Sequence, residues 1–341
     1  MEGLPGGARN KIRAAKTARK RQSEVFSPQS THSRLLSLTV QHHRIQGRGT
    51  NSLVLEFIVF GDDLEMTLKK LILFLVVLVS FEGSAYATWS VIAIDKNTKK
   101  VVLAAASCVN TSDDFMKDAL AVVVPGIGAA VCQARADSTH QNQLLVFNEL
   151  NKGTDPGKII EMLSADAAFD SRQYGILDMQ GRFAGRSGLN NNSESLWKGG
   201  RIPGTDIYYS IQGNTLSPGT VLAAEKAFAA AKGALTDRVM AALQAGDDQG
   251  GDTRCMCSPE PVGGTQLPCD AKHAHVAFIL LANPTDTIES HSTGKYFMYI
   301  TVSQPAADHP FGAKIGENLN PVKTLRMRYD AWRKTMPADF R

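Results

Sequence analysis

Thr88 stands where proteolytic processing would turn it into a self-contained catalytic group. It follows Ser84-Ala85-Tyr86-Ala87, in which Ala85 and Ala87 occupy the A-x-A positions that signal peptidase requires. Cleavage after Ala87 would leave a threonine with a free α-amine. A threonine hydroxyl is a weak nucleophile, but an α-amine with an ordinary pKa of about 7.7–8.0 can act as its general base near neutral pH. The pattern predicts attack on an amide or related acyl carbon, followed by hydrolysis of the acyl-enzyme.

Such a reaction also needs donors for the developing oxyanion and groups that hold the substrate. The side chain of Asn214 and backbone N–H groups near Gly213 are the candidate donors. The structural alternative for Asn214 is a turn residue beside a glycine. Asp252 and Arg254 either form a buried ion pair near the cleft, where the arginine could bind a carboxylate bidentately, or make a solvated loop pair.

The segment before Thr88 has the three parts of a secretory signal peptide. Residues 66–87 begin with Met66 and two lysines, continue through an apolar run at 71–79 and end in small residues. An uncleaved membrane anchor is the alternative, but the apolar run is about half of the ~20 residues that span a bilayer. Residues 1–65 are then predicted to be a disordered upstream extension or the product of a misassigned start. A nucleic-acid-binding arm or an organelle-targeting leader is the functional alternative.

Charge is divided unevenly between leader and mature chain. The 341 residues carry a formal net charge of +4, but 12 basic and 7 acidic residues precede Thr88 while 25 basic and 26 acidic residues follow from it. A near-neutral mature chain argues against nucleic acid as a partner. Its length of about 250 residues suffices for one sizeable core, and we expect a single domain at 88–341.

Hairpins and grouped helices predict the class of fold that must position these residues. The predicted strands cover 89–95, 100–108, 121–124, 128–134, 174–178, 182–186, 206–212, 276–281 and 296–302. The predicted helices cover 144–150, 156–168, an Ala-rich region from 217 to 245 that breaks near Gly233, and 322–332. This order favours an α+β fold, and the sequence has no glycine-rich dinucleotide or phosphate motif.

Five cysteines are compatible with an oxidising compartment. We expect Cys269 to pair with Cys255 or Cys257, and we leave open whether Cys108 and Cys132 are reduced core residues. A zinc site that combines His273 and His275 with Cys255, Cys257, Cys269 and Asp270 is the less favoured alternative, because the C-x-x-C spacing is missing. We therefore expect neither metal nor cofactor.

The chain resembles the mostly bacterial DUF1028 family of unknown function across nearly all of its mature part. Members typically open with Thr or Ser, an aromatic residue and then Ser-Ile-Val-Ala-x-Asp, and residues 88–95 read TWSVIAID. Similar segments are 126–134, 173–182, Ile211-Gln212-Gly213-Asn214 and the Gly-Gly-Asp-x-Arg run at 250–254. The resemblance implies a four-layer αββα sandwich of the N-terminal nucleophile (Ntn) hydrolase type, with Thr88 at a cleft. It places Gln133, Gln212, Asp252 and Arg254 as substrate-binding candidates.

The chain departs from this pattern in two places. The loop at 255–272, with three cysteines, is inserted where the family runs almost directly into a strand. The strand at 100–108 also lacks the Asp that organises the nucleophile in proteasome-like Ntn hydrolases. The leading prediction is a secreted or periplasmic Ntn-type amidohydrolase that acts on a small peptide or metabolite, with no membrane span after cleavage. The alternative is a catalytically silent scaffold that binds a small ligand or an envelope protein; a homo-oligomer is compatible with either.

Overall fold

A computed structural model describes residues 88–109, 111–192, 194–255, 273–303 and 316–337. The predicted extension at 1–65, the predicted signal peptide at 66–87 and all but the first residue of the cysteine-containing loop lie outside these ranges. Among the helices within them, none is long and apolar enough to span a membrane.

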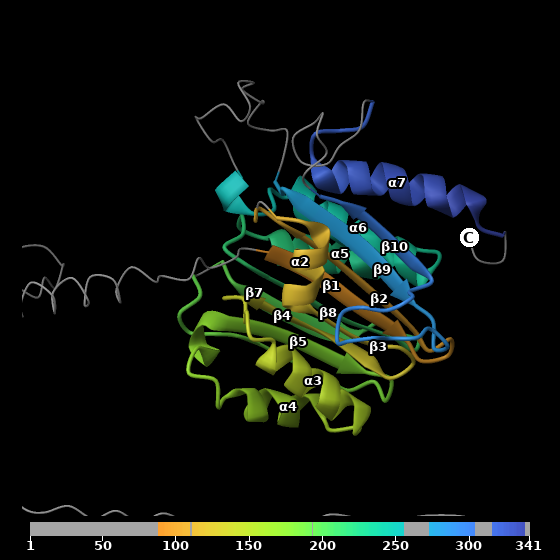
Figure 1. Ribbon diagram of the computed structural model, residues 1–341. Coiled ribbons are helices and arrows are strands. Elements are labelled where there is room, and N and C mark those ends of the chain that lie inside the picture. Colours follow the sequence, from red (N-terminus) through yellow and green to blue (C-terminus); the bar gives the residue numbers. More distant parts are fainter. Residues whose placement is uncertain (1–87, 110, 193, 256–272, 304–315, 338–341) are drawn as a thin grey trace, which may run out of the picture. The chain divides into compact units, whose positions relative to one another are not determined.

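The larger sheet contains six antiparallel strands in the order β10-β9-β2-β1-β8-β7 (Figure 1). They are β1 (Thr88–Asp95), β2 (Lys100–Ser107), β7 (Leu196–Arg201), β8 (Ile207–Asn214), β9 (Val276–Ala282) and β10 (Met298–Val302). Strand β1 pairs along its whole length with β2 on one side and β8 on the other. The predicted hairpin at 89–108 is therefore confirmed, and Thr88 is the first residue of a central strand.

The smaller sheet contains four antiparallel strands in the order β3-β4-β5-β6. These are β3 (Ala121–Val124), β4 (Gly128–Ala134), β5 (Arg172–Asp178) and β6 (Phe183–Ser187). Strands β3 and β4 form one hairpin, closed by a Pro-Gly turn, and β5 and β6 form another, closed by a Gln-Gly turn, whereas residues 135–171 separate β4 from β5.

Helices cover the outer faces of the two sheets (Figure 1). The larger sheet packs against α5 (Thr220–Ala230), α6 (Leu235–Asp248) and α7 (Pro321–Thr335), and the smaller one against α3 (Gln141–Asn151) and α4 (Pro156–Leu163). A third core lies between the sheets, and α2 (Asp113–Leu120) contributes Met116 and Leu120 to it. The predicted α+β class is confirmed, with helices, sheet, sheet and helices in succession.

Alternation along β1 explains how one strand serves two cores. Trp89, Val91 and Ala93 pack toward α5 and α6, whereas Ile92 and Ile94 pack toward the smaller sheet. Because successive side chains of a strand point to opposite faces, Thr88 and Ser90 also face the smaller sheet. This alternation places the Thr88 side chain on the face covered by the smaller sheet, and so decides which residues can contact it.

The predicted elements differ from the structure mainly at short or exposed segments. The predicted helix at 156–168 ends at Leu163, and α2 and β7 were not predicted at all. Strand β7 has the sequence LWKGGR, which includes two glycines, and it forms at a sheet edge where pairing with β8 stabilises it. Helix α2 has only eight residues, too few for a clear apolar repeat.

Candidate active site

Thr88 lies between two polar residues of neighbouring strands. Its partners in register are Ser107 at the end of β2 and Asn214 at the end of β8. The Thr88 hydroxyl donates to Ser107 Oγ at 3.1 Å, and Ser107 Oγ also accepts from the backbone N–H of Val109 at 3.2 Å. Thr88 is 2% exposed in the full chain. The sheet therefore places a hydroxyl pair at one end of the layer between the two sheets.

Gln133 of β4 connects the smaller sheet to the first residues of β1. Its Nε2 donates to the Thr88 carbonyl at 3.0 Å and to Gln173 Oε1 at 2.7 Å, while its Oε1 accepts from Ser90 Oγ at 2.7 Å. Asn214 Oδ1 is 3.5 Å from the same Nε2. Buried polar groups are costly unless they are hydrogen-bonded, so this network fixes the position of β1 relative to β4.

Thr88 and Ser107 line a small cavity of about 30 Å³. Most of the other lining residues are apolar, including Met116 and Leu120 of α2. A volume of this size holds about one water molecule or a comparably small group. A larger groove of about 790 Å³ adjoins it, because Phe115, Ala119 and Ala136 line both. The arrangement provides a narrow space at the hydroxyls and a wider one beside them.

The described residues that line the small cavity include no carboxylate, histidine or lysine. Cys132 is among them, but its thiol belongs to the core beneath α3 and α4, and burial raises its pKa to about 12. A thiol with that pKa is neutral at pH 7 and is a poor nucleophile. The hydroxyls of Thr88, Ser107 and Thr111 are therefore the lining groups with nucleophilic potential, and none of the lining side chains can take their proton.

Gly213 and Gln212 have packing roles beside Thr88. A Cβ on Gly213 would lie 2.1 Å from Leu216 Cδ1, so no larger residue fits without a shift, and the Gly213 carbonyl accepts from Gln173 Nε2 at 2.9 Å. Gln212 is fully buried and its Oε1 accepts from Ser210 Oγ at 2.9 Å. Of the predicted substrate-binding residues, Gln133 lines the small cavity, whereas Gln212 is not among its lining residues.

Asp252 and Arg254 form an ion pair just beyond the strand ends that carry Ser107 and Asn214. Arg254 Nη2 lies 2.8 Å from Asp252 Oδ2, with the carboxylate fully buried and the guanidinium one-third exposed. The carboxylate also accepts from the backbone N–H of Cys108 at 2.9 Å. The pair thus holds the loop after α6 against the end of β2, and neither residue lines the small cavity.

The cysteine predictions need correction. Cys108 forms a disulfide with Cys255, so Cys108 is not a reduced core residue, and Cys255 does not pair with Cys269. Cys132 is a buried free thiol, as one alternative predicted. Cys257 and Cys269 lie outside the described residues. The disulfide also removes Cys255 from the zinc site considered with His273 and His275.

Three members of the polar cluster, Ser90, Ser107 and Gln173, were not predicted as site residues. Gln173 is fully buried and, besides its bonds to Gln133 and Gly213, donates to the Ser187 hydroxyl at 2.5 Å. A sequence signal exists for two of them, because Ser90 and Gln173, like the predicted Gln133, are polar residues inside otherwise apolar strands. Only the pairing of the strands shows that all three meet at Thr88.

The fold and the polar cluster describe an α+β protein with a threonine at the head of its central strand. Residues 88–259 match the model of a family of unknown function, DUF1028, and the chain belongs to this family. Among solved structures, a crystal structure of a DUF1028 protein from Silicibacter pomeroyi is similar, with 18% sequence identity and a TM-score of 0.49 over 74% of this chain and 91% of that one. No functionally curated protein matches the chain.

Proposed function

We propose that this protein is a secreted or periplasmic Ntn-type hydrolase in which Thr88, once it is the first residue, cleaves amide bonds of a small peptide or metabolite. The observation that carries the proposal is the place of Thr88 at the head of a central strand, with its hydroxyl at a cavity. The succession of helices, two sheets and helices supports the Ntn-like assignment. The family match begins at Thr88, which supports this residue as the start of the mature domain.

The proposed reaction uses both functional groups of one residue. The α-amine of Thr88 accepts the hydroxyl proton as Oγ1 attacks the acyl carbon, and the ammonium then protonates the leaving amine. Water, activated by the same amine, hydrolyses the resulting ester and restores the hydroxyl. The cavity has no side-chain base among its described lining residues. In this scheme the α-amine of Thr88 is the base, and it lies on the same residue as the nucleophile.

Asn214 is the candidate donor to the oxyanion in this scheme. It lies opposite Thr88 in register and faces the same layer between the sheets. A preorganised donor of this kind typically contributes about 10²–10³ in rate. Ser107 stands near the position where proteasome-like enzymes have an aspartate, and we propose that its hydroxyl orients that of Thr88. The backbone N–H of Gly213 remains a second candidate donor.

The sizes of the two spaces suggest the class of substrate. A cavity of about 30 Å³ next to the hydroxyls has room for about one heavy atom, such as the carbonyl oxygen under attack, and the adjoining groove of about 790 Å³ accommodates the rest of a small substrate. Gln133 is the substrate-binding candidate that lines the cavity. Asp252 and Arg254 do not line the cavity, so their role in this scheme is to hold the strand ends that carry Ser107 and Asn214.

The experiment starts by establishing the N-terminus. The frame from Met66 is expressed with export, and the intact mass and N-terminal sequence of the product are determined. The mature protein is then treated with small peptide epoxyketones, which react with both the hydroxyl and the amine of an N-terminal threonine. We expect one covalent adduct on the peptide that begins at Thr88, retained in Thr88→Ser and absent in Thr88→Ala.

Two controls separate this proposal from the silent-scaffold alternative. A variant with one extra residue before Thr88 keeps the hydroxyl but blocks the amine, and it should not be labelled. Thr98→Ala, in the exposed turn between β1 and β2, should be labelled like the wild type. If the chain begins at Thr88 and is folded but none of the reagents modifies Thr88, the nucleophile assignment is wrong and the scaffold alternative is favoured.

A further inference from the structure

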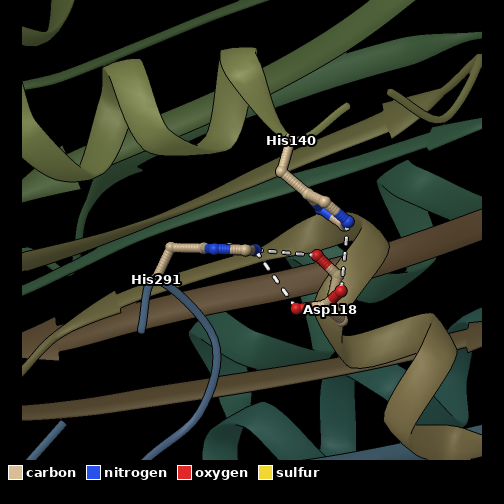
Figure 2. A group of neighbouring side chains, drawn as sticks. All are labelled: Asp118, His140 and His291. Carbon is tan, nitrogen blue, oxygen red and sulfur yellow. Dashed lines mark hydrogen bonds and ion pairs between the residues drawn. The ribbon is translucent and has the colours of Figure 1, made fainter. Parts of the chain in front are cut away.

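Two histidines and an aspartate meet at the edge of the wider groove. Asp118 lies in the last turn of α2, His140 directly precedes α3, and His291 lies in the connection between β9 and β10. In Figure 2 the two imidazole rings approach the Asp118 carboxylate from different elements. Asp118 Oδ2 lies 3.2 Å from His140 Nε2, and Asp118 Oδ1 lies 3.5 Å from His291 Nε2.

We propose that Asp118, His140 and His291 bind a divalent transition metal ion, with Zn²⁺ as the best match. Imidazole nitrogen and carboxylate oxygen bind Zn²⁺ at about 2.0–2.2 Å, and tetrahedral geometry then separates neighbouring donor atoms by about 3.3–3.5 Å. The two separations, 3.2 and 3.5 Å, lie near that spacing, but they involve different oxygens of Asp118, so one imidazole must move toward the oxygen that binds the ion. One candidate donor atom from each of the three residues lies within 4.8 Å of the other two, which is close enough for one ion to be shared after local side-chain adjustment.

The His140 side chain contacts the cluster rather than capping its own helix. His140 adopts φ +57, a left-handed conformation in which histidine, like asparagine and aspartate, is enriched among residues other than glycine. It is the N-cap of α3, but its side chain makes no capping hydrogen bond. A serine, threonine, asparagine or aspartate would cap the helix better. The imidazole instead reaches Asp118, and its ring centroid lies 5.3 Å from that of His291.

Neighbouring groups hold the carboxylate and the second imidazole. Ser292 donates its hydroxyl to Asp118 Oδ1 at 2.8 Å, which leaves further lone pairs on the carboxylate for a metal. His291 Nε2 is 2.9 Å from the Asp118 backbone carbonyl, and its side chain is 6% exposed. The contact from Ser292 orients the carboxylate, as outer contacts of metal ligands do. A ring nitrogen that binds a metal has no proton to donate, so His291 Nε2 gives up its contact with the carbonyl when the ion binds. The competing explanation is a hydrogen-bonded His-Asp-His bridge that ties α2 to the neighbouring loops without a metal.

The proposed site has an open side. Asp118 and His140 also line the groove of about 790 Å³, together with Arg135 and Arg172. Three protein ligands leave a fourth position for water or for a ligand in the groove, the arrangement of zinc sites that bind small molecules. The metal site does not depend on Thr88 chemistry, and its test needs no substrate.

The test measures metal binding to the full chain, purified without an affinity tag and treated with EDTA. Calorimetric titration with Zn²⁺ alone should give one site, and Co²⁺ should give the visible absorption of a four-coordinate ion. We expect His140→Ala and Asp118→Asn each to weaken Zn²⁺ binding at least about 100-fold, more than loss of an outer contact does. His291→Gln, which retains a donor for the backbone carbonyl, should do the same.

Controls distinguish this site from other sources of binding. Circular dichroism and thermal unfolding without metal establish that each variant is folded, and Zn²⁺ should raise the Tm of the wild type but not of the variants. His275→Gln removes a histidine outside the cluster and should bind Zn²⁺ normally. The proposal is overturned if the folded wild type binds no Zn²⁺, if the cluster variants bind it unchanged, or if binding is lost in His275→Gln instead.

Discussion

At the scale of single residues, Gln133 has an unusually large share of the polar contacts around Thr88. It contacts the Thr88 carbonyl, the Ser90 hydroxyl and the Gln173 amide from within a strand whose residues are all buried. Each partner is itself buried, so none can form a hydrogen bond with solvent in its place if Gln133 is lost. A buried group left without its partner costs about 1–3 kcal/mol.

Gln133→Leu should therefore destabilise the protein more than a surface substitution does. The change keeps a similar volume but leaves three buried groups without a partner, and we expect a loss of about 2–4 kcal/mol in the free energy of unfolding. Urea unfolding followed by circular dichroism measures it. Gln180→Leu in the exposed turn between β5 and β6 is the matched control, with an expected change within about 0.5 kcal/mol. Equal effects of the two substitutions would show that the network contributes nothing.

At the scale of elements, a buried carboxylate joins α6, α7 and the approach to β9. Asp247 is fully buried at the C-terminal end of α6. Asn320 is the N-cap residue of α7, and its Nδ2 donates to both oxygens of Asp247 at 2.9 Å. His273 Nδ1 lies 3.3 Å from Asp247 Oδ1. This hydrogen-bonded pairing with Asp247 raises the pKa of His273 above its ordinary 6.5, against the opposing effect of burial.

A raised histidine pKa predicts the direction of a pH effect on stability. The folded protein binds the His273 proton more tightly than the unfolded chain does, so this contribution is complete below about pH 6.5 and is lost as the pH rises through the folded-state pKa. The free energy of unfolding should fall as the pH rises above about 6.5, and His273→Gln should reduce that fall. Urea unfolding across the pH range, with His275→Gln as the control, measures this. A pH dependence unchanged by His273→Gln would contradict the assignment.

At the scale of the whole molecule, one disulfide closes most of the described chain into a loop. Cys108 and Cys255 are 147 residues apart in sequence, and they join the end of β2 to the loop after α6. The bond also lies next to the Asp252–Arg254 ion pair, so two different links hold the strand ends beside Thr88. A disulfide between distant residues restricts the unfolded chain and is consistent with the proposed export to an oxidising compartment.

Removal of this disulfide should lower stability throughout the fold. We expect the double variant Cys108→Ser/Cys255→Ser to lose about 2–4 kcal/mol in the free energy of unfolding. Urea unfolding under oxidising conditions measures the loss, and peptide mapping without reduction identifies the bond in the exported wild type. A wild type in which Cys255 is linked to Cys257 or Cys269 would overturn the pairing.

Strand periods and turn residues were enough to predict much of the fold from sequence. The strands at 121–124 and 128–134 have the predicted bounds, and the hairpin at 89–108 differs by one residue at each end. These segments are buried on both faces, which makes their apolar runs long and clear. Strand β7 and helix α2 escaped prediction because β7 depends on its neighbour β8 and α2 is short.

The sequence by itself determined the α+β class, the family resemblance and the prediction of Thr88 as the candidate nucleophile. It could do so because strand alternation, turn residues and processing motifs are local patterns. Only the tertiary structure decided which residues surround Thr88, since Gln133, Gln173 and Ser107 reach it through pairing and stacking of distant strands. It also decided the partner of Cys108 and brought Asp118, His140 and His291 together. Such contacts join residues up to 173 positions apart, and no local pattern encodes them.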